Sequence, residues 1–484
     1  MSLSSSLANA LTGLNAASRG AAVISSNVAN ATTPGYARRE LHLSAAALGG
    51  YGAGVRVDGV TRAVTQPVLN DRRVADAESG NADLRRAFLD RIETAIGDPG
   101  EASSLGGRYA ALESALVSAA SRPDSGVRLQ EVLTAAQALT GTLGRLNDTI
   151  QGARMEADAQ IAKEVATLNT SLQGIADLNV KITSFRALGQ DVSALMDQRQ
   201  TLVDRVAEIV PVREMPRAGD QIGLYTTGGA ILLESQPQPV GFSGVGVITA
   251  DMTITSGALS GLMLGAVQLP TGDPGPMGGG RLGALFAVRD GLATNAQTQV
   301  DALARDLIER FQAPGPDATL LPGQPGLFTD GGGVVNPLTE AGLSGRIAVS
   351  GLADPAQGGA LWRLRDGLGA AAPGNVGDAT LLQGLNAALT QTRVPASGGF
   401  SGTARAAAGL AAAVLSGISS ARQTAEDGRT AAATRSAALS DLLAEDGVDT
   451  DAEMQRLLLI EQAFSANARV IQSVDDLIRQ LIGL

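Results

Sequence analysis

The sequence predicts a mainly α-helical protein with smaller β-rich parts, in which helices at the two ends of the chain pair as a coiled coil. Apolar residues repeat with a heptad period at both ends. A helical period also runs for about sixty residues in the first half of the chain. Two segments, 211–276 and 313–400, replace this period by alternating or Gly- and Pro-rich sequence. We therefore expect paired terminal helices, a long-helix bundle and a small outer β-domain.

The composition allows substantial cores but gives no surface for nucleic acid. The chain has 484 residues, of which 44% are apolar and only 3% aromatic, and it contains 60 glycines. These values suit about two to four domains built from small aliphatic side chains. The net charge of -11 leaves no basic surface to neutralise phosphates, so nucleic acid is not an expected partner. The absence of cysteine excludes disulfides and thiolate chemistry.

The N-terminal helix has a regular apolar seam and an uncharged outer face. Between Met1 and Ala37, Arg19 is the only charged side chain, and Ser, Thr and Asn occupy many positions off the seam. Because a helix in water normally carries Lys and Glu on its outer face, this helix is expected to meet protein on several sides, as in a polymer of identical subunits. The seam, which we expect to take part in self-association, consists of Leu3, Leu7, Ala10, Leu14, Ala17, Ala21, Ile24 and Val28.

A turn and a short hairpin follow this helix. In Ala31-Thr32-Thr33-Pro34-Gly35-Tyr36 the proline and glycine suit the second and third positions of a type II turn, which ends the helix. Residues 40–62 then alternate between apolar and polar side chains around Gly49-Gly50-Tyr51-Gly52, a pattern that predicts a small β-hairpin. The inner terminal domain is expected to comprise residues 1–36 and 446–484.

The bundle domain is predicted to comprise residues 37–210 and 277–445, including the hairpin. Its longest helix begins near Pro123-Asp124 and ends near Gly189, a length of roughly 90 Å that calls for a rod or a bundle. A further helix spans residues 285–311, and an Ala-rich helix spans about 403–443. Residues 313–400 are expected to form loops and short strands, with the single Trp362 as a core anchor.

The small outer β-domain is predicted at residues 211–276. Pro211 ends the preceding helix, and two strand-like runs, Gln221-Ile222-Gly223-Leu224-Tyr225 and Ala230-Ile231-Leu232-Leu233, flank the turn Thr227-Gly228-Gly229. The cluster Pro270-Thr271-Gly272-Asp273-Pro274-Gly275-Pro276 closes the segment, after which the helical period resumes.

The C-terminal helix mirrors the N-terminal one. After a break at Glu445-Asp446-Gly447, Thr450 and Glu453 have the spacing of a capping box. Each terminal seam covers about four heptads, and isolated helices of this length are marginal, so we expect the two helices to pair. The alternative is that each helix lies on an ordinary core. The C-terminal seam consists of Leu457, Ile460, Phe464, Asn467, Ile471, Val474, Ile478 and Leu481.

Asn467 is the only polar residue of the C-terminal seam. It either fixes the register of the helix pair at some cost in stability, or lies off the seam and contacts a neighbouring subunit. The sequence alone does not separate these two interpretations.

No constellation of residues predicts catalysis, a metal site or a bound cofactor. His42 is the only histidine, so a catalytic triad would depend on this residue alone and a multi-histidine zinc site has too few ligands. No Lys follows Gly278-Gly279-Gly280, as a phosphate-binding loop requires. The acidic residues of 446–453 lack the spacing of a calcium loop and suit helix capping instead. We therefore expect a protein without enzyme activity.

Motifs at both ends of the chain carry a family resemblance. The N-terminal motif is Ser25-Ser26-Asn27-Val28-Ala29-Asn30-Ala31-Thr32-Thr33-Pro34-Gly35-Tyr36, and the C-terminal motif spans residues 453–471. Both are similar to the ends of the flagellar rod, hook and hook-associated proteins, the axial family of the bacterial flagellum. The resemblance implies that assembly uses both seams together with Asn27, Asn30, Thr33, Pro34, Gly35 and Tyr36.

Internal motifs resemble one branch of this family, the proteins of the hook–filament junction. The motifs are Ile92-Glu93, Ser121-Arg122-Pro123-Asp124 with Arg128, Leu195-Met196-Asp197-Gln198-Arg199, and Gly279-Gly280-Arg281-Leu282-Gly283-Ala284-Leu285. Gln200 and Glu461 depart from the expected pattern, in which an Asp and a Gln are typical, without changing the assignment. Residues 213–275 and 313–400 carry little resemblance.

The resemblance implies a structural subunit of the hook–filament junction, outside the cell. It further implies a homo-oligomer whose paired terminal helices line a central channel, with hook protein and hook-associated protein 3 as neighbours. Export through the flagellar type III apparatus, assisted by a chaperone, agrees with the lack of a cleavable signal sequence and of an apolar run long enough for membrane insertion. The ends would then order on assembly, by coupled folding and binding.

Two other interpretations stay open at this point. The terminal motifs are shared within the family, so the chain could be another axial protein, such as hook protein, distal rod protein or hook-associated protein 3. A protein of a different class, a secreted hydrolase or adhesin, could use residues 213–275 or 313–400 on an axial scaffold.

Overall fold

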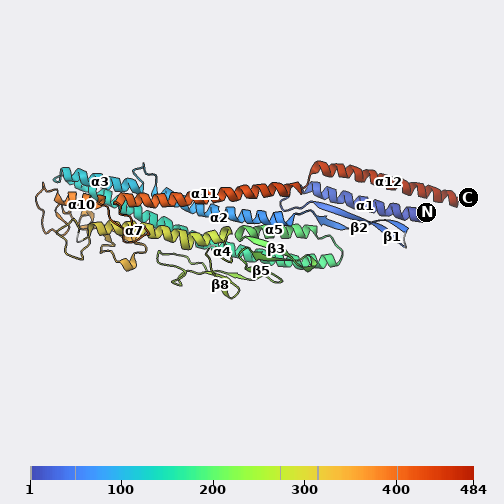
Figure 1. The fold of residues 1–484 in the computed structure, drawn as a ribbon, viewed down its shortest axis with the longest axis horizontal. Coiled ribbons are helices and arrows are strands. Elements are labelled where there is room, and N and C mark those ends of the chain that lie inside the picture. Colours follow the sequence, from blue (N-terminus) through green and yellow to red (C-terminus); the bar gives the residue numbers. More distant parts are fainter. Residues whose placement is uncertain (1–2, 49–50, 273, 313–314, 401, 484) are drawn as a thin grey trace.

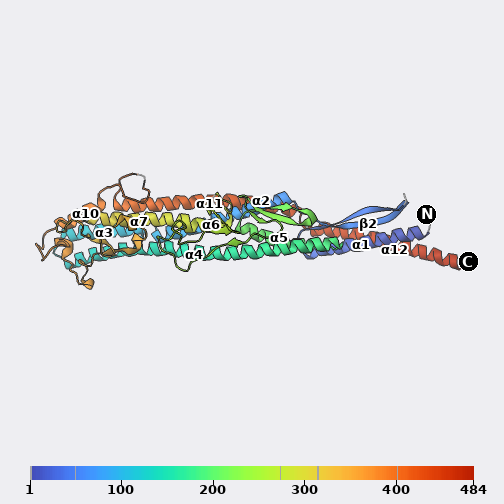
Figure 2. The ribbon, with the colours of Figure 1, turned by 90° about the horizontal axis from the view of Figure 1, so that it is seen from below.

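The computed structural model describes residues 3–48, 51–272, 274–312, 315–400 and 402–483. The molecule is a long rod, and the two ends of the chain lie together at one end of it (Figure 1). A terminal unit occupies that end, and a helical bundle with irregular segments along its sides forms the rest (Figure 2). The predicted class, mainly α with small β parts, is confirmed. Gly49 and Gly50 of the predicted hairpin turn lie outside the described residues.

The terminal unit consists of two antiparallel helices and a hairpin. Helix α1 (Leu3–Ala29) packs along α12 (Thr450–Ile482), and the strands β1 (Arg39–Leu48) and β2 (Tyr51–Arg62) lie along α1 (Figure 1). The hydroxyl of Thr12 in α1 accepts a hydrogen bond from the backbone N–H of Val55 at 3.2 Å, which holds the hairpin on the helix. The structure confirms both the predicted hairpin and the pairing of the two ends.

The bundle is built from long helices that run along the rod. The longest is α4 (Gly126–Ala187), with 62 residues, and the hydroxyl of Ser125 caps its start by accepting a hydrogen bond from the N–H of Arg128. This helix is followed by Gly189 at a φ of 70°, so the predicted long helix is confirmed. The other bundle helices are α2 (Gln66–Ile96), α3 (Leu105–Ser121), α5 (Ser193–Ile209), α6 (Gly280–Ala287), α7 (Ala293–Phe311) and α11 (Ala407–Glu445).

Apolar side chains at helical spacing place α4 in the centre of the bundle. Leu139, Leu143, Leu146 and Ile150 are at most 1% exposed. Helices α3 and α5 pack on α4, whereas α11 packs on α2. A π-helical turn, Val288–Leu292, joins α6 to α7 where the sequence predicted one uninterrupted helix.

Two small antiparallel sheets lie on one side of the bundle (Figure 1). Their buried residues, among them Leu224, Leu232 and Val240, belong to the same hydrophobic cluster as the bundle helices. The strands predicted within 211–276 are present, and they form a layer that shares the core of the bundle. One sheet contains β3 (Val212–Pro216), β4 (Ile222–Thr226) and β5 (Ile231–Leu233), and the other β6 (Val240–Gly241), β7 (Leu262–Leu264) and β8 (Val267–Leu269).

Buried charged side chains hold the irregular segment between β6 and β7 on the bundle. Arg289, in the π-helical turn, pairs with Asp158 of α4 at 2.6 Å, and both side chains are at most 1% exposed. Arg154 of α4 donates hydrogen bonds to the carbonyl oxygens of Thr249 at 2.9 Å and Met252 at 2.5 Å. Backbone carbonyls that secondary structure leaves unpaired thus find donors on the bundle.

Short elements make up the segment 315–400 at the far end of the rod. Strand β9 (Phe328–Asp330) pairs with β10 (Ile347–Val349). The helices are α8 (Leu343–Arg346), α9 (Arg363–Asp366) and α10 (Thr380–Thr390), and the last of these packs on α3 and α7.

The prediction that Trp362 anchors the core of this segment is wrong. Trp362 is only half-buried, and the guanidinium of Arg363 lies 4.9 Å from its ring centre. Phe311 and Phe328 fill the core instead, with ring centres 5.1 Å apart in an edge-to-face arrangement. The rings of Phe311 in α7 and Phe328 in β9 therefore form the core contact that was expected of Trp362.

Candidate assembly surface

Helices α1 and α12 meet in a ladder of contacts that repeats every seven residues. A Cβ atom added to Gly13 would lie 2.8 Å from Nδ2 of Asn467, and one added to Gly20 would lie 2.7 Å from Cδ1 of Ile460. One heptad further along α1, the amide nitrogen of Asn27 donates to Oε2 of Glu453 at 3.2 Å. Each step of seven residues forward in α1 is a step of seven back in α12, as in an antiparallel coiled coil.

The predicted seam of α1 is only partly used in this contact. Ala10, Ala17 and Ile24 are buried. The glycines that let the two helices approach were not among the predicted seam residues, because glycine adds no apolar side chain to a periodic pattern. The rest of the predicted seam is half-buried: Leu3, Leu7, Leu14, Ala21 and Val28.

The predicted seam of α12 faces α1, but the helix keeps a large exposed apolar surface. Val474 is buried, whereas Phe464 and Leu481 are exposed, and the other five seam residues, Leu457, Ile460, Asn467, Ile471 and Ile478, are half-buried. Next to this seam, and sharing Leu481 with it, lies a second apolar row, which we call the α12 flank. It consists of Leu459, Val470, Leu477 and Leu481, all more than 40% exposed. An exposed apolar row of this length is typical of a surface that binds protein.

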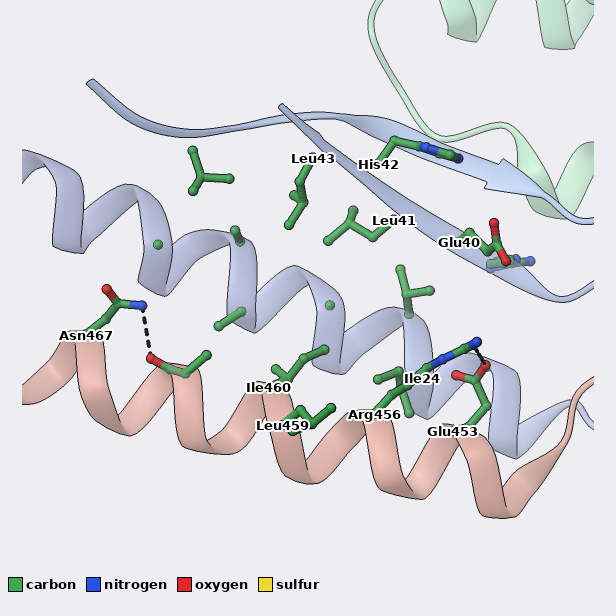
Figure 3. A pocket seen from close by; sticks show the side chains of 18 residues that line it. Ile24, Glu40, Leu41, His42, Leu43, Glu453, Arg456, Leu459, Ile460 and Asn467 are labelled. Atoms are coloured by element: carbon green, nitrogen blue, oxygen red, sulfur yellow. Dashed lines mark hydrogen bonds and ion pairs between the residues drawn. The ribbon is translucent and has the colours of Figure 1, made fainter. Parts of the chain in front are cut away.

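A groove of about 580 Å³ lies between α1, the hairpin and α12. Its floor is formed by small residues of α1, including Gly13, Ala16 and Gly20. Leu41 and Leu43 extend from β1 toward α1, and Leu459 and Ile460 line the α12 side (Figure 3). Charged residues, among them Glu40, Glu453 and Arg456, lie at one end (Figure 3). We call this feature the terminal groove; its walls suit an apolar helix edge better than a small polar ligand.

Asn27 is the centre of the N-terminal motif in the fold. Its amide nitrogen donates to the carbonyl oxygen of Arg39 at 2.9 Å and to Glu453. Its amide oxygen accepts from the hydroxyl of Tyr36 at 2.8 Å and from the backbone N–H of Arg39 at 2.9 Å. The side chain is fully buried, and all four hydrogen bonds that an amide can readily make are formed.

The remaining motif residues shape the turn after α1. The N–H of Tyr36 donates to the carbonyl oxygen of Thr33 at 3.1 Å, and Gly35 has a φ of 78°, as the predicted type II turn requires. Pro34 is exposed, and the side chain of Asn30 donates to the carbonyl oxygen of Ser26 at 2.9 Å. A Cβ atom on Gly35 would lie 2.6 Å from the hydroxyl of Thr201 in α5, so glycine also permits contact with the bundle.

Asp197 of α5 ties the terminal unit to the bundle. Its carboxylate pairs with Arg62 of β2 at 2.7 Å and with Arg39 of β1 at 3.3 Å. The guanidinium of Arg39 also stacks over the ring of Tyr36, 4.9 Å from its centre. The sequence pointed to this segment of α5 only through its resemblance to junction proteins, and no periodic signal indicated that Asp197 meets the hairpin.

The predicted capping box of α12 is wrong. Asp449, not Thr450, caps the helix, because its carboxylate accepts hydrogen bonds from the N–H groups of Asp451 at 2.9 Å and Ala452 at 3.1 Å. Glu453 is 2% exposed and turns away from the cap toward Asn27. A capping box needs a Glu that reaches back to its own helix start, and here this side chain serves the contact between helices instead.

Among the described residues, no group of three or more His, Cys, Asp or Glu side chains could hold a metal ion. In the same part of the chain, no helix is long and apolar enough to cross a membrane. The single His42 lies within hydrogen-bond distance of Thr61 across the hairpin, with 2.6 Å between Nε2 and Oγ1.

Three family models match the chain. The model of the flagellar hook-associated protein FlgK helical domain matches residues 89–327. The flagella basal body rod protein model matches residues 7–36, and the model of the flagellar basal body rod FlgEFG protein C-terminal matches residues 443–484. The terminal matches thus fall on α1 and α12, and the central match covers α3 to α7.

The similarity to known relatives covers about half of this chain. Flagellar hook-associated protein 1 of Salmonella typhimurium is 27% identical over 239 residues, 48% of this chain and 43% of the relative. The protein of the same name from Escherichia coli is 25% identical over 239 residues, with the same coverage, and that from Bacillus subtilis is 21% identical over 220 residues, 43% of each chain. The matches therefore span less than half of the relatives' own length.

Among solved structures, the flagellar hook junction protein FlgK from Burkholderia pseudomallei is similar to this chain. The TM-score is 0.43 at 20% sequence identity, and the similarity covers 54% of this chain and 47% of that chain.

Proposed function

We propose that this chain, as a member of the family of flagellar hook-associated protein 1, is a structural subunit of the junction between the flagellar hook and filament. Its role is to form a layer of the extracellular tube, without catalysing a reaction. The observation that carries the proposal is the apolar surface that the terminal unit leaves uncovered, namely the terminal groove and the α12 flank.

Copies of the same chain are the occupants that we propose for these surfaces. The outer face of α1 is uncharged apart from Arg19 and carries the exposed Leu11. Such a face packs against another uncharged helix without burying an unpaired charge. A homo-oligomer of terminal units, with hook protein and hook-associated protein 3 on either side along the tube, would cover the groove and the flank together.

We further propose export through the flagellar type III apparatus with the help of a chaperone. A terminal unit held by one helix pair and a two-stranded hairpin buries little apolar surface in a single chain. Its helices would gain most of their stability when neighbouring subunits cover them, which is coupled folding and binding. Export of an extended end and ordering on assembly follow from the same property.

Electron microscopy of flagella from cells that lack this gene tests the proposed function, together with an immunoblot of the medium for flagellin. A junction subunit predicts intact bare hooks and flagellin lost to the medium. Missing hooks would instead identify a hook or rod protein, the nearest alternative. Normal filaments would contradict any structural role in the flagellum.

A further inference from the structure

One polar pair is buried in the contact between α1 and α12. Asn27 is 0% and Glu453 is 2% exposed, and the two are joined by the 3.2 Å hydrogen bond from Nδ2 to Oε2. We propose that this pair selects the register of the two terminal helices, so that one heptad alignment is populated and the neighbouring ones are excluded. The inference concerns pairing within one chain and stands independently of the proposed junction role.

The other contacts between α1 and α12, at Gly13 and Gly20, discriminate poorly between heptad alignments. Gly13 and Gly20 are one heptad apart and offer the same empty space to α12. A slip of seven residues would therefore place Ile460 against Gly13 instead of Gly20 with little change in packing. Repeated seams of this kind are prone to alternative registers unless a polar position separates them.

The contact at Asn27 does discriminate between heptad alignments, because the N–H that Asn27 donates to α12 is held in one direction. The backbone of Arg39 bonds to both ends of the Asn27 amide, and Tyr36 also donates to the amide oxygen, so the orientation of the amide is fixed and its second N–H is directed at Glu453 of α12. In the slip that puts Ile460 against Gly13, Glu453 would face Gly20, which offers no side-chain donor. In the opposite slip, Asn27 would face Ile460 and lose its bond to the carboxylate. Arg456 of α12 pairs with Oε1 of Glu453 at 2.9 Å and would move with it, but either slip leaves one N–H of the buried Asn27 amide without its acceptor.

Asn467, the polar residue that the sequence offered for this role, is placed differently. Its amide donates to the carbonyl oxygen of Ala463 in its own helix at 3.0 Å, and its side chain lies against Gly13 (Figure 3). Because this hydrogen bond stays within α12, it would survive any slip of the helix. The register is therefore assigned to a pair whose two members lie 426 positions apart in the sequence.

Paired cysteines test the proposal, since the natural chain has none. The full-length chain carrying Gly20→Cys with Ile460→Cys reports the observed register, and Gly13→Cys with Ile460→Cys reports the slip of one heptad. Each pair is made in the otherwise natural sequence and with Glu453→Leu, Glu453→Gln or Asn467→Leu. Disulfides formed under mild oxidation are quantified by non-reducing gel and mass spectrometry, and helix content is followed by circular dichroism.

In the natural background we expect the in-register disulfide to exceed the slipped one by at least about tenfold, because a slip leaves a buried N–H of Asn27 without its acceptor. Glu453→Leu should bring the yields of the in-register and slipped disulfides to within about threefold of each other at unchanged helix content. The reason is that an apolar residue can lie opposite either Asn27 or Gly20. Glu453→Gln keeps an acceptor for Asn27, and Asn467→Leu leaves the pair intact, so both should retain the natural ratio.

Three outcomes would overturn the proposal. The first is a natural ratio retained in Glu453→Leu, which would assign register to packing alone. The second is a ratio shifted by Asn467→Leu, which would return the role to the seam asparagine. The third is the absence of the in-register disulfide in the natural background, because α1 and α12 would then not pair in this way. None of these outcomes depends on whether cells lacking the gene make filaments.

Discussion

Asn27 shows at the scale of single residues how the N-terminal motif acts in the fold. A buried amide that makes every one of its hydrogen bonds tolerates no change of donor or acceptor. The motif contains Asn27 and Tyr36, which bond to each other, but the other partners of Asn27, Arg39 and Glu453, lie outside it. The motif is thus one half of a contact whose other half is at the opposite end of the chain.

We expect Asn27→Asp to weaken the pairing of α1 with α12 by about 3 kcal/mol. The change removes both amide donors and places a second carboxylate beside Glu453. Hydrogen exchange of the α12 backbone should accelerate strongly, while exchange in α4 stays unchanged. Asn15→Asp, the same change at an exposed position of α1, is the control. Equal protection of α12 in both variants would contradict this account of Asn27.

Two glycines illustrate the difference between a closely packed position and an open one. At Gly20 a methyl group would lie 2.7 Å from Cδ1 of Ile460, so this side chain must move and Gly20→Ala should lose the gain in helix propensity that an open position offers. At Gly144 of α4 nothing lies within 4 Å of the added carbon, so Gly144→Ala should stabilise by about 0.5–1 kcal/mol through helix propensity. Urea unfolding followed by circular dichroism measures both changes, and equal stabilisation by the two substitutions would refute the assignment of Gly20 as a closely packed position.

At the scale of elements, the long helices owe their positions to apolar periodicity, whereas the irregular segments are held by buried polar side chains. Asp301 of α7 is an example. Its carboxylate accepts hydrogen bonds from the N–H groups of Gly342 and Ser344, both at 2.8 Å, and from the hydroxyl of Ser344 at 2.6 Å. Burial nevertheless raises the pKa of Asp301 above its ordinary value of 3.8, because the charged form loses its hydration.

This raised pKa predicts a pH dependence of stability. A carboxyl group whose pKa is higher in the folded state binds more protons there than in the unfolded chain. Its contribution to the free energy of unfolding is therefore greatest below pH 3.8 and declines as the pH rises through the folded pKa. Asp301→Asn should remove this decline, whatever its effect on absolute stability.

Urea unfolding at a series of pH values from about 3.5 to 7 measures the slope in the natural chain and in Asp301→Asn. Asp378→Asn is the matched control, because hydrogen bonds from Thr380 lower the pKa of Asp378 and its loss should change the slope in the opposite direction. Identical slopes in the natural chain and Asp301→Asn would exclude the proposed effect of burial.

The two ends of the rod differ in what they leave uncovered, which is a property of the whole molecule. The bundle closes around one extensive hydrophobic cluster. The terminal unit has only one layer on each side of α1, so α12 keeps the α12 flank in contact with water. Stability and assembly are therefore separable, because substitutions on the flank touch no core.

We expect Leu459→Gln combined with Leu477→Gln to leave the stability of the single chain within about 0.5 kcal/mol of the natural value, since both side chains are exposed. In cells the same variant should reduce the number of filaments severely and release flagellin, because the flank no longer buries apolar surface between copies. Leu338→Gln, at a position that is 93% exposed in the segment 315–400, is the control and should leave filaments normal. Normal filaments in the double variant would contradict the role of the flank.

Much of this architecture could be predicted because its signals are local. The apolar period of α4 and the alternation in the hairpin are written in consecutive residues, and the structure follows both. The predictions failed where a residue had two possible uses. Glu453 has the spacing of a capping box but pairs with Asn27, and Trp362 has the size of a core anchor but remains half-buried.

Local patterns in the sequence are sufficient to show that the ends of this chain are helices with apolar seams, that they flank a long helical bundle, and that they resemble the axial family in their motifs. Three further features become visible only in the folded chain: which residues of α1 and α12 meet, where the terminal groove lies, and that Asp197 links the hairpin to the bundle. The physical reason is that helical period is fixed by neighbours along the chain, whereas register and groove depend on contacts between residues hundreds of positions apart. Gly13 and Gly20 contribute to those contacts by the absence of a side chain, which no hydrophobic pattern records.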